Sequence, residues 1–480
     1  MKYILSTILV ALCVSSCSDW LDVEPKTNVR EERLFSDEQG FKEALTGAYI
    51  LTSKPPLYGK ELTYGFIDQL AQRYVNPVNV DLIFDFTKPT FYNFELTALQ
   101  TKNYTNAIWS ESYNIIANIN NLIENIEKRG DRVTTPGLRD IIHGEALGLR
   151  AFLHFDLLRM FGPTYKSNFS DTSIPYRTQF NRDTKALLPA TEIVELVLSD
   201  LKKAEALLEN DPMDISYESP SNGATNNPFL HRRSKRMNKF AVKALMARVY
   251  LYKGDMAEAK NKANEVINAE NKSGNRIFEF VTDNAKDHLL SKELIFAISM
   301  DKTDFATRIR GDFDGSQFSY CNAGDRARLN EIFDVKNDGV NDIRMREAGG
   351  FSVTTTTTTT QKYRQDNSHE SINNTIPLIR LAEMYYIVAE ATADLSESAR
   401  VLSQVRKARA LESLQAFRDE DEKLKNIEKE YRKEFYAEGQ LWHFYKRKEY
   451  KTFLFSPIKE MNEKHYRFSV PENEITFGNL

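Results

Sequence analysis

The chain has 480 residues, of which 41% are hydrophobic, and its formal net charge is −4 at pH 7. This composition describes a globular protein with enough apolar residues for one large or two medium domains. Because nucleic-acid-binding proteins usually carry a basic excess, the charge balance argues against a nucleic-acid partner.

The first residues have the features of an export signal followed by a lipid attachment site. Lys2 precedes an uncharged run over residues 4–16, which is too short to span a bilayer as a helix. The run ends in small residues directly before Cys17, as a lipoprotein signal peptidase requires. We therefore expect residues 1–16 to be a signal peptide and 17–35 a lipidated tether, since several acyl chains hold a protein firmly at a membrane. An ordinary secretory signal with a chance cysteine is the alternative.

Amphipathic helices are predicted over most of the remaining chain. The segment Ser36-Asp37-Glu38-Gln39 has the spacing of a capping box, which predicts that a helix begins there. Apolar residues then recur with a helical period over residues 106–127 and again over 142–160. Turn residues at 129–130 and 136–137 separate these two segments. We expect the two helices to form an antiparallel pair.

The helical period returns further along, over residues 191–208, 241–254, 255–267 and 378–408. Small residues at Ala241, Ala244 and Ala247 would allow neighbouring helices to approach closely. Helix pairs of this size, joined by short turns, are typical of tetratricopeptide-like repeats, although the repeat period is too degenerate here to identify them by itself.

Two stretches break the helical pattern and are expected to be insertions in a single domain that covers residues 36–480. The first, at about 54–100, is aromatic and rich in turn residues. The second, at about 271–374, mixes short apolar runs with Gly and Asp and contains the threonine run 354–360. Because threonine has high β propensity, this run predicts an edge strand or a mobile loop.

No sequence pattern for catalysis or for metal binding is evident. None of the seven histidines is paired with another at metal-ligand spacing, and His154, on an apolar helix, is expected to be a satisfied core residue. Residues 334–342 are rich in oxygen ligands but miss the EF-hand spacing. An acidic turn is therefore favoured over a calcium site. The basic cluster 232–236 is expected to be a solvated turn. Carboxylate pairs for sugar hydrolysis stay open, because 68 acidic residues offer many of them.

Several motifs occur in order along the whole chain, among them residues 17–25, 144–162, 241–254, 380–391, 430–439 and 470–475. Together they resemble the SusD/RagB family of nutrient-binding outer-membrane lipoproteins of Bacteroidetes. The second motif, which runs from Gly-Glu-Ala to Phe-Asp-Leu and a final Gly, is the most specific. Small departures occur at Pro163 and in the turn before Pro471.

This resemblance implies a mostly α fold, with a tetratricopeptide-like helical-repeat frame that carries irregular loop and short-strand insertions. It implies lipid anchoring to the outer membrane through Cys17, and the acidic residues that follow resemble a signal for export to the cell exterior. It also implies a SusC-like TonB-dependent transporter as partner, with no cofactor and no catalysis. The motif residues Glu145, Arg150, Arg159 and Glu390 are then expected in ion pairs of the frame rather than in contact with ligand.

Aromatic residues in the insertions are the candidates for ligand binding. Oligosaccharides are held by aromatic faces and by polar side chains, which loops display well. We predict that Tyr74 and Tyr92 stack on sugar rings, with Asp68 and Arg73 as polar partners and Tyr320 from the second insertion. The alternative for most of these aromatic residues is a local core.

The expected function is therefore surface capture of an oligosaccharide and its delivery to the transporter. A peptide-binding, RagB-like role is one alternative, because aromatic clefts serve both kinds of ligand. A scaffold subunit, whose helical concavity only grips the transporter, is the other.

Overall fold

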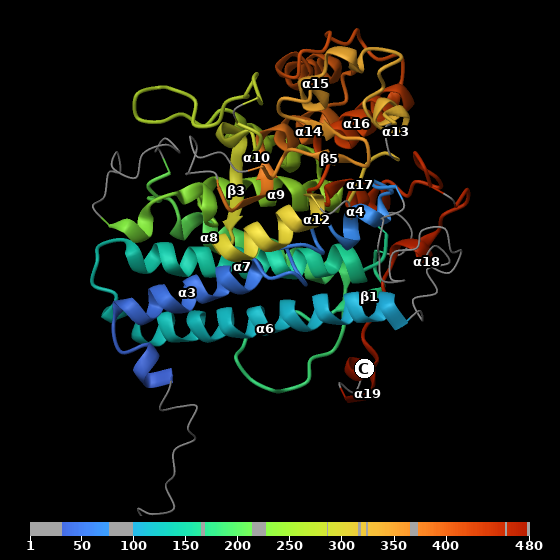
Figure 1. The fold of residues 1–480 in the computed structure, drawn as a ribbon. Coiled ribbons are helices and arrows are strands. Elements are labelled where there is room, and N and C mark those ends of the chain that lie inside the picture. The colour runs from blue at the N-terminus through green and yellow to red at the C-terminus, as the bar shows by residue number, and fades with distance from the viewer. Residues whose placement is uncertain are drawn as a thin grey trace, which may run out of the picture.

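The structure is a computed structural model that describes residues 31–75, 99–164, 169–213, 227–285, 287–314, 318–322, 325–364, 373–456 and 458–477. Long helices dominate these residues (Figure 1). They are α3 (Glu38–Thr52), α6 (Leu99–Arg129), α7 (Leu138–Phe161), α8 (Ala190–Leu207), α9 (Lys239–Lys253), α10 (Met256–Ile267), α14 (Leu381–Ala391), α15 (Leu395–Ala408) and α16 (Glu420–Glu434). From α6 onward each helix packs on the next in this order, and we call this series the frame. It confirms the predicted tetratricopeptide-like architecture.

Helix α7 lies at the centre of the lower layer, between α6 and α8 (Figure 1). Every residue from Gly144 to Phe161 is buried, so the single apolar face expected for 142–160 extends around the helix, and its charged side chains are paired inside the protein. Glycines permit the close packing. A Cβ atom added at Gly148 would lie 2.5 Å from Cγ of Met237.

Helix ends follow the sequence closely. Helix α3 begins where it was predicted, but its cap is Asp37, whose carboxylate accepts a hydrogen bond from the Gly40 N–H at 3.0 Å. The Ser36 hydroxyl instead donates to the Arg33 carbonyl at 2.8 Å, so the predicted Ser36 capping box is wrong. The Asn238 side chain caps α9 by accepting from two N–H groups.

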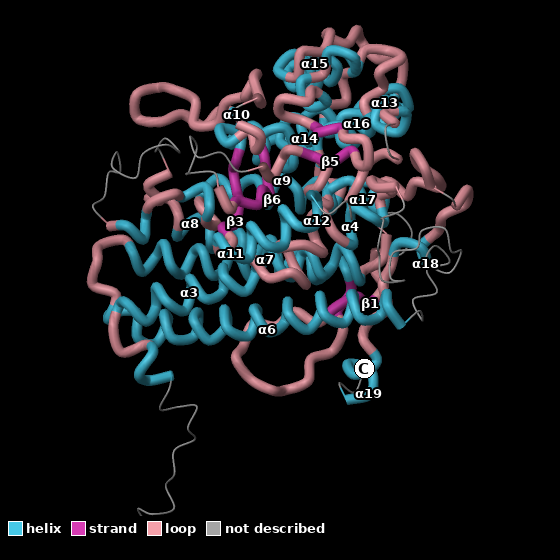
Figure 2. The backbone as a smooth tube through the Cα atoms, in the orientation of Figure 1, coloured by secondary structure: helices cyan, strands magenta, loops and turns pink. Residues whose placement is uncertain are grey.

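The strands in the described residues are short and pair in three antiparallel sheets of two (Figure 2). They are β1 (Thr172–Ile174) with β2 (Leu188–Pro189), β3 (Leu294–Ser299) with β6 (Thr375–Arg380), and β4 (Phe351–Val353) with β5 (Thr358–Thr360). Strand β5 is the end of the threonine run, which confirms the strand prediction there. Strand β6 is wholly buried and leads directly into α14.

The remaining elements are short and lie mostly in the two predicted insertions and near the C-terminus. The α-helices are α4 (Phe66–Leu70), α11 (Lys302–Asp304), α12 (Arg310–Asp314), α13 (Ala327–Ile332), α17 (Gln440–Arg447), α18 (Glu463–Tyr466) and α19 (Glu472–Phe477). A π-helical segment, η6 (Phe305–Ile309), joins α11 to α12, and 3-10 turns are η2 (Gly130–Arg132), η3 (Pro228–Leu230), η4 (Arg233–Lys235), η5 (Ser291–Glu293), η7 (Gly339–Asn341) and η8 (Ile343–Met345).

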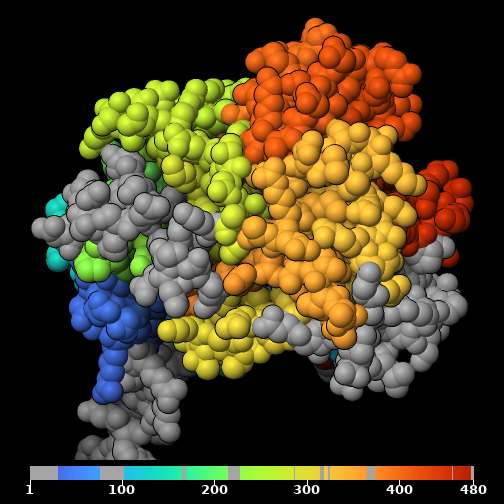
Figure 3. Space-filling view, turned by 45° about the horizontal axis from the view of Figure 1, so that its top comes forward, coloured from blue at the N-terminus to red at the C-terminus, as the bar shows by residue number. Residues whose placement is uncertain are grey.

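Two segments of the second insertion share one face of the molecule. Figure 3 shows residues 294–314, in yellow, beside residues 325–364, in amber and orange, and α12 contacts β5 there. None of the described helices combines the length and the apolar character that crossing a membrane requires.

Candidate functional site

Aromatic side chains from both predicted insertions meet in one buried cluster. Its rings are those of Tyr64, Tyr74, Phe313, Phe318, Tyr320 and Tyr363. The contacting rings have centroids 4.9 to 6.0 Å apart, in tilted, edge-on and stacked arrangements. Because such pairs stabilise a fold by about 0.5–1.5 kcal/mol each beyond burial, the cluster fastens the two insertions together.

Asp68 joins this cluster to the turn that follows α16. Its carboxylate accepts hydrogen bonds from the N–H groups of Ala437 at 2.7 Å and Gly439 at 3.0 Å. Both residues have positive φ, 59° and 72°, so the turn directs these N–H groups toward one acceptor. Burial raises the pKa of Asp68 to about 7. The positive charge of Arg73 and the two N–H groups act in the opposite direction and lower this pKa, but burial has the larger effect.

The structure brings four of the predicted ligand-binding residues together, but inside the protein. Asp68, Arg73, Tyr74 and Tyr320 are 0, 2, 4 and 0% exposed. The Arg73 guanidinium donates to the Arg432 carbonyl at 2.9 Å and lies over the Tyr320 ring. The local-core alternative therefore describes these side chains. Direct contact with a ligand stays a prediction that their burial does not support.

A cavity of about 330 Å³ lies beside the aromatic cluster. Its lining comes from the end of η6, from α12 and from the segment that ends β5: Ile309, Arg310, Phe313, Thr360, Gln361, Tyr363 and Arg364. The apolar members are buried, whereas Arg310 and Arg364 are exposed and Gln361 is half-buried. The volume falls in the range of small-ligand sites, about 300–1,000 Å³. The cavity thus offers an apolar base with hydrogen-bonding groups at its rim.

The charged side chains that line this cavity, among the described residues, are both cations. The lining contains two guanidinium groups and no carboxylate among the described residues. Asp312, on the same helix as Arg310, is held by the Lys60 ammonium group at 3.0 Å and by the Tyr64 hydroxyl at 2.9 Å.

The wall at residues 360–364 is fixed from beneath. Lys362, between two lining residues, points inward, pairs with Glu438 and donates to the Tyr436 carbonyl at 2.8 Å. The Tyr363 hydroxyl donates to the Ala437 carbonyl at 2.7 Å. Burial lowers the pKa of Lys362 to about 8, although Glu438 opposes this shift. The cavity wall therefore rests on the turn after α16, as Asp68 does.

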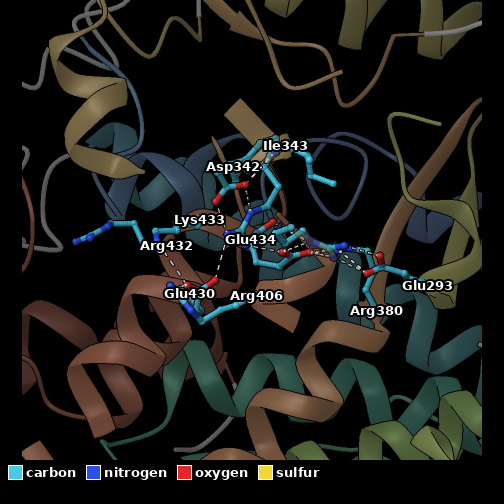
Figure 4. Close-up of polar contacts among 12 residues, drawn as sticks. Glu293, Asp342, Ile343, Arg380, Arg406, Glu430, Arg432, Lys433 and Glu434 are labelled. Atoms are coloured by element: carbon cyan, nitrogen blue, oxygen red, sulfur yellow. Dashed lines mark hydrogen bonds and ion pairs between the residues drawn. The ribbon is translucent and has the colours of Figure 1, made fainter. Parts of the chain in front are cut away.

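Beneath this turn lies a network of buried ion pairs (Figure 4). Among the described residues, equal numbers of cations and carboxylates take part: Arg344, Lys362, Arg380, Arg406, Arg409 and Lys433 with Glu293, Asp338, Asp342, Glu430, Glu434 and Glu438. Because its charges balance, we interpret the network as structural.

Glu434 occupies the middle of this network, with Arg380 and Glu293 on one side and Glu430 on the other (Figure 4). Its carboxylate lies 2.7 Å from Arg344, 2.5 Å from Arg380 and 2.8 Å from Arg409. Burial alone would raise the pKa of Glu434, but these guanidinium groups hold it well below its usual range. Glu434 is therefore charged in the folded protein.

The ion pairs expected for the family motifs are present in the frame. They are Arg150 with Asp200, Arg159 with Asp156, Glu145 with Arg233, and Glu390 with Arg447. The interpretation of 232–236 as a solvated turn is wrong, because Arg233 is buried between Glu145 and Asp211. The Glu145 carboxylate is buried on α7, so the fold needs this cation inside.

His154 and the acidic segment 334–342 also have structural partners. His154 donates from Nδ1 to the Arg150 carbonyl at 2.9 Å and accepts at Nε2 from the Arg177 N–H at 3.0 Å, as expected for a satisfied core residue. Burial lowers its pKa to about 3. In segment 334–342, Lys429, Arg406, Lys433 and Arg344 pair with the carboxylates. No group of side chains suited to a metal ion occurs in the described part of the chain.

A second hollow, of about 480 Å³, lies on the frame between α10, α14 and α15. Both of its arginines have structural partners. Arg400 lies 2.6 Å from Glu397, and the Arg276 guanidinium donates to the Ile267 carbonyl at 3.1 Å. The cavity beside the aromatic cluster is therefore the better candidate for binding a ligand with polar groups.

Sequence reasoning missed Arg310, Gln361 and Arg364. They belong to no motif and follow no period, and their only signal was membership of the second predicted insertion. Tyr92 and the lipidation site Cys17 lie outside the described residues, so their roles stay predictions.

Comparisons with known proteins agree with this fold. Residues 217–479 match a family model described as the SusD family, and residues 19–251 match one described as starch-binding and associating with the outer membrane. The SusD-like protein P38 of Formosa agariphila is 26% identical, over 91% of this chain and 89% of its own.

Solved structures give the same result. A SusD superfamily protein from Bacteroides thetaiotaomicron superposes with a TM-score of 0.66 at 19% identity, covering 92% of this chain and 98% of its own. A SusD-like carbohydrate-binding protein from Bacteroides vulgatus does so with a TM-score of 0.67 at 18% identity, covering 92% and 97%. These likenesses confirm the helical-repeat fold.

Proposed function

We propose a function for this protein from an established premise, which is that the chain belongs to the SusD family. The protein captures an oligosaccharide at the cell surface without catalysis and passes it to a SusC-like TonB-dependent transporter. The family description as starch-binding and outer-membrane-associated supports this proposal, as does the carbohydrate-binding relative from Bacteroides vulgatus.

The observation that carries the proposal is the cavity beside the aromatic cluster. Arg310, Gln361 and Arg364 provide hydrogen-bond donors, and Thr360 adds a hydroxyl group. Each hydrogen bond to a sugar hydroxyl contributes about 0.5–1.5 kcal/mol net, so several are needed for useful affinity. The cavity holds the end or a branch of a glycan rather than a long chain, given its volume of about 330 Å³.

Rigid support lowers the cost of binding at this cavity. Tyr363 and Lys362 fasten one wall to the turn after α16, and the aromatic cluster fastens Phe313 in the other. A site whose side chains are already ordered loses less conformational entropy when ligand binds. The ion-pair network beneath the turn thus supports binding without contacting the ligand.

The anchoring part of the proposal comes from the sequence. A lipid on Cys17 and a tether over residues 17–35 would keep the domain of residues 36–480 near its transporter at the outer membrane. The domain boundaries and the removal of residues 1–16 are part of this proposal. Membrane fractionation of Cys17→Ala tests it, because the variant should be released from the membrane.

A calorimetric titration tests ligand capture. The protein without its signal peptide is titrated with a panel of oligosaccharides and with a peptide mixture, and Gln361→Ala is measured beside it. Heat with a class of sugar that weakens in Gln361→Ala supports the proposal. Heat with peptides alone would favour the RagB-like alternative, and no heat with either would leave a scaffold.

A further inference from the structure

The described side chains that line the cavity carry a charge opposite to that of the protein as a whole. The chain has a net charge of −4, yet the lining holds two arginines and no carboxylate among the described residues. Resting on the proposed function, we propose that the sugar bound here carries an anionic group, either a uronate carboxylate or a sulfate ester.

The Arg364 side chain makes no structural contact that would occupy its guanidinium group within the described residues. Its backbone N–H donates to the Gln361 carbonyl at 2.9 Å, which closes the turn at the cavity wall. Its guanidinium group forms no hydrogen bond or ion pair with any described residue. The arginines of the buried network, by contrast, each contact one or more carboxylates. Within the described part of the chain, no side chain therefore competes with an anion for Arg364.

The carboxylates near the cavity are already paired within the described residues. Asp312 is held by Lys60 and Tyr64, and Asp304 lies 3.3 Å from Arg308 and 3.4 Å from Lys54. Paired carboxylates repel an incoming anion much less than free ones would. Among the described residues, the charged side chains in the lining of the cavity are therefore the cations of Arg310 and Arg364.

The chemistry of the rim also fits an oxyanion better than a neutral hydroxyl. A guanidinium group presents parallel N–H donors that match two oxygens of a carboxylate or a sulfate. The Gln361 side chain, which is half-buried in the same wall, adds an amide donor. Phe313 and Tyr363 are only 4% and 3% exposed, so the stacking that neutral glycans rely on is small in this cavity.

Matched oligosaccharides test this inference. The full mature chain is titrated calorimetrically with an oligogalacturonate, with its carboxyl-reduced neutral form, and with a sulfated galactan oligosaccharide. We expect the uronate or the sulfated sugar to bind at least about tenfold more tightly than the neutral form, and the preference to weaken with salt. The sugar that binds identifies the anionic group.

Variants assign the effect to the cavity. Arg364→Gln should weaken binding of the anionic sugar about tenfold and leave the neutral form unchanged. Arg400→Gln is the control, because Arg400 is exposed on α15 and pairs with Glu397 away from this cavity. Circular dichroism checks that both variants fold.

The outcomes separate the two proposals. Equal binding of charged and neutral sugars, or an unchanged affinity in Arg364→Gln, would overturn the anionic preference and leave glycan capture standing. If no sugar of any kind binds, both the proposed function and this inference fail.

Discussion

Replacement of Glu434 by Gln should destabilise the protein strongly, because it removes the charge at the centre of the buried network. The carboxylate lies within 2.8 Å of three guanidinium groups, and the Glu434 side chain is buried. Breaking a buried ion pair typically costs about 3–5 kcal/mol, since the partner charges stay buried. We expect Glu434→Gln to lose about 3 kcal/mol or more of unfolding free energy at pH 7.

Urea unfolding followed by circular dichroism measures this loss from the shift of the midpoint. The matched control is Glu397→Gln, whose carboxylate makes an exposed pair with Arg400 and should change stability little. The folded-state pKa of Glu434 lies well below its ordinary value of 4.5, so its stabilising effect is complete above pH 4.5 and lost as the pH falls further. The gap between the two variants should therefore shrink in acid. Equal midpoints at pH 7 would refute a structural role for the network.

Three further predictions concern the cluster, the core and pH. Tyr74→Phe should cost about 1 kcal/mol through loss of the 2.9 Å hydrogen bond to the Tyr64 carbonyl, with ligand affinity unchanged in calorimetry; lost affinity would instead support direct contact. Gly148→Ala should cost about 1–3 kcal/mol in urea unfolding, because its Cβ would meet Met237, whereas Gly47→Ala, with open space, should be neutral or stabilising. Burial raises the pKa of Glu61 from 4.5 to about 7, so the folded chain keeps a proton that the unfolded chain releases, and stability should fall as the pH rises across that window. Glu61→Gln should flatten this dependence, and an unchanged slope would contradict it.

The helical frame was predictable because its signals are local. A helix repeats its environment every 3.6 residues, so apolar periodicity located the pairs α6 with α7 and α14 with α15. Motif arginines such as Arg150 were expected in ion pairs and are found there. The strand at the end of the threonine run also follows from local propensity.

The candidate site was less predictable because burial there depends on distant partners. Tyr74 and Tyr320 are as suited to stacking on sugars as to packing on one another, and the sequence contains no signal that separates the two. Only the folded chain brings Phe318 against Tyr74, and with it the ring faces are covered. The composition of the insertions thus predicted the aromatic residues, but it did not indicate that Tyr74 and Tyr320 are buried in the fold.

Residues 362 and 364 show most directly what the sequence determines and what only the tertiary structure decides. By itself, the sequence determined a lipoprotein-like start, a helical-repeat frame and the family. It presented Lys362 and Arg364 as two similar cations in one loop. The tertiary structure alone decided that Lys362 is buried against Glu438, 76 residues away, while Arg364 is exposed at the cavity. The reason is physical: a charge becomes structural or available according to the partner that folding brings to it, and local sequence carries no record of that partner.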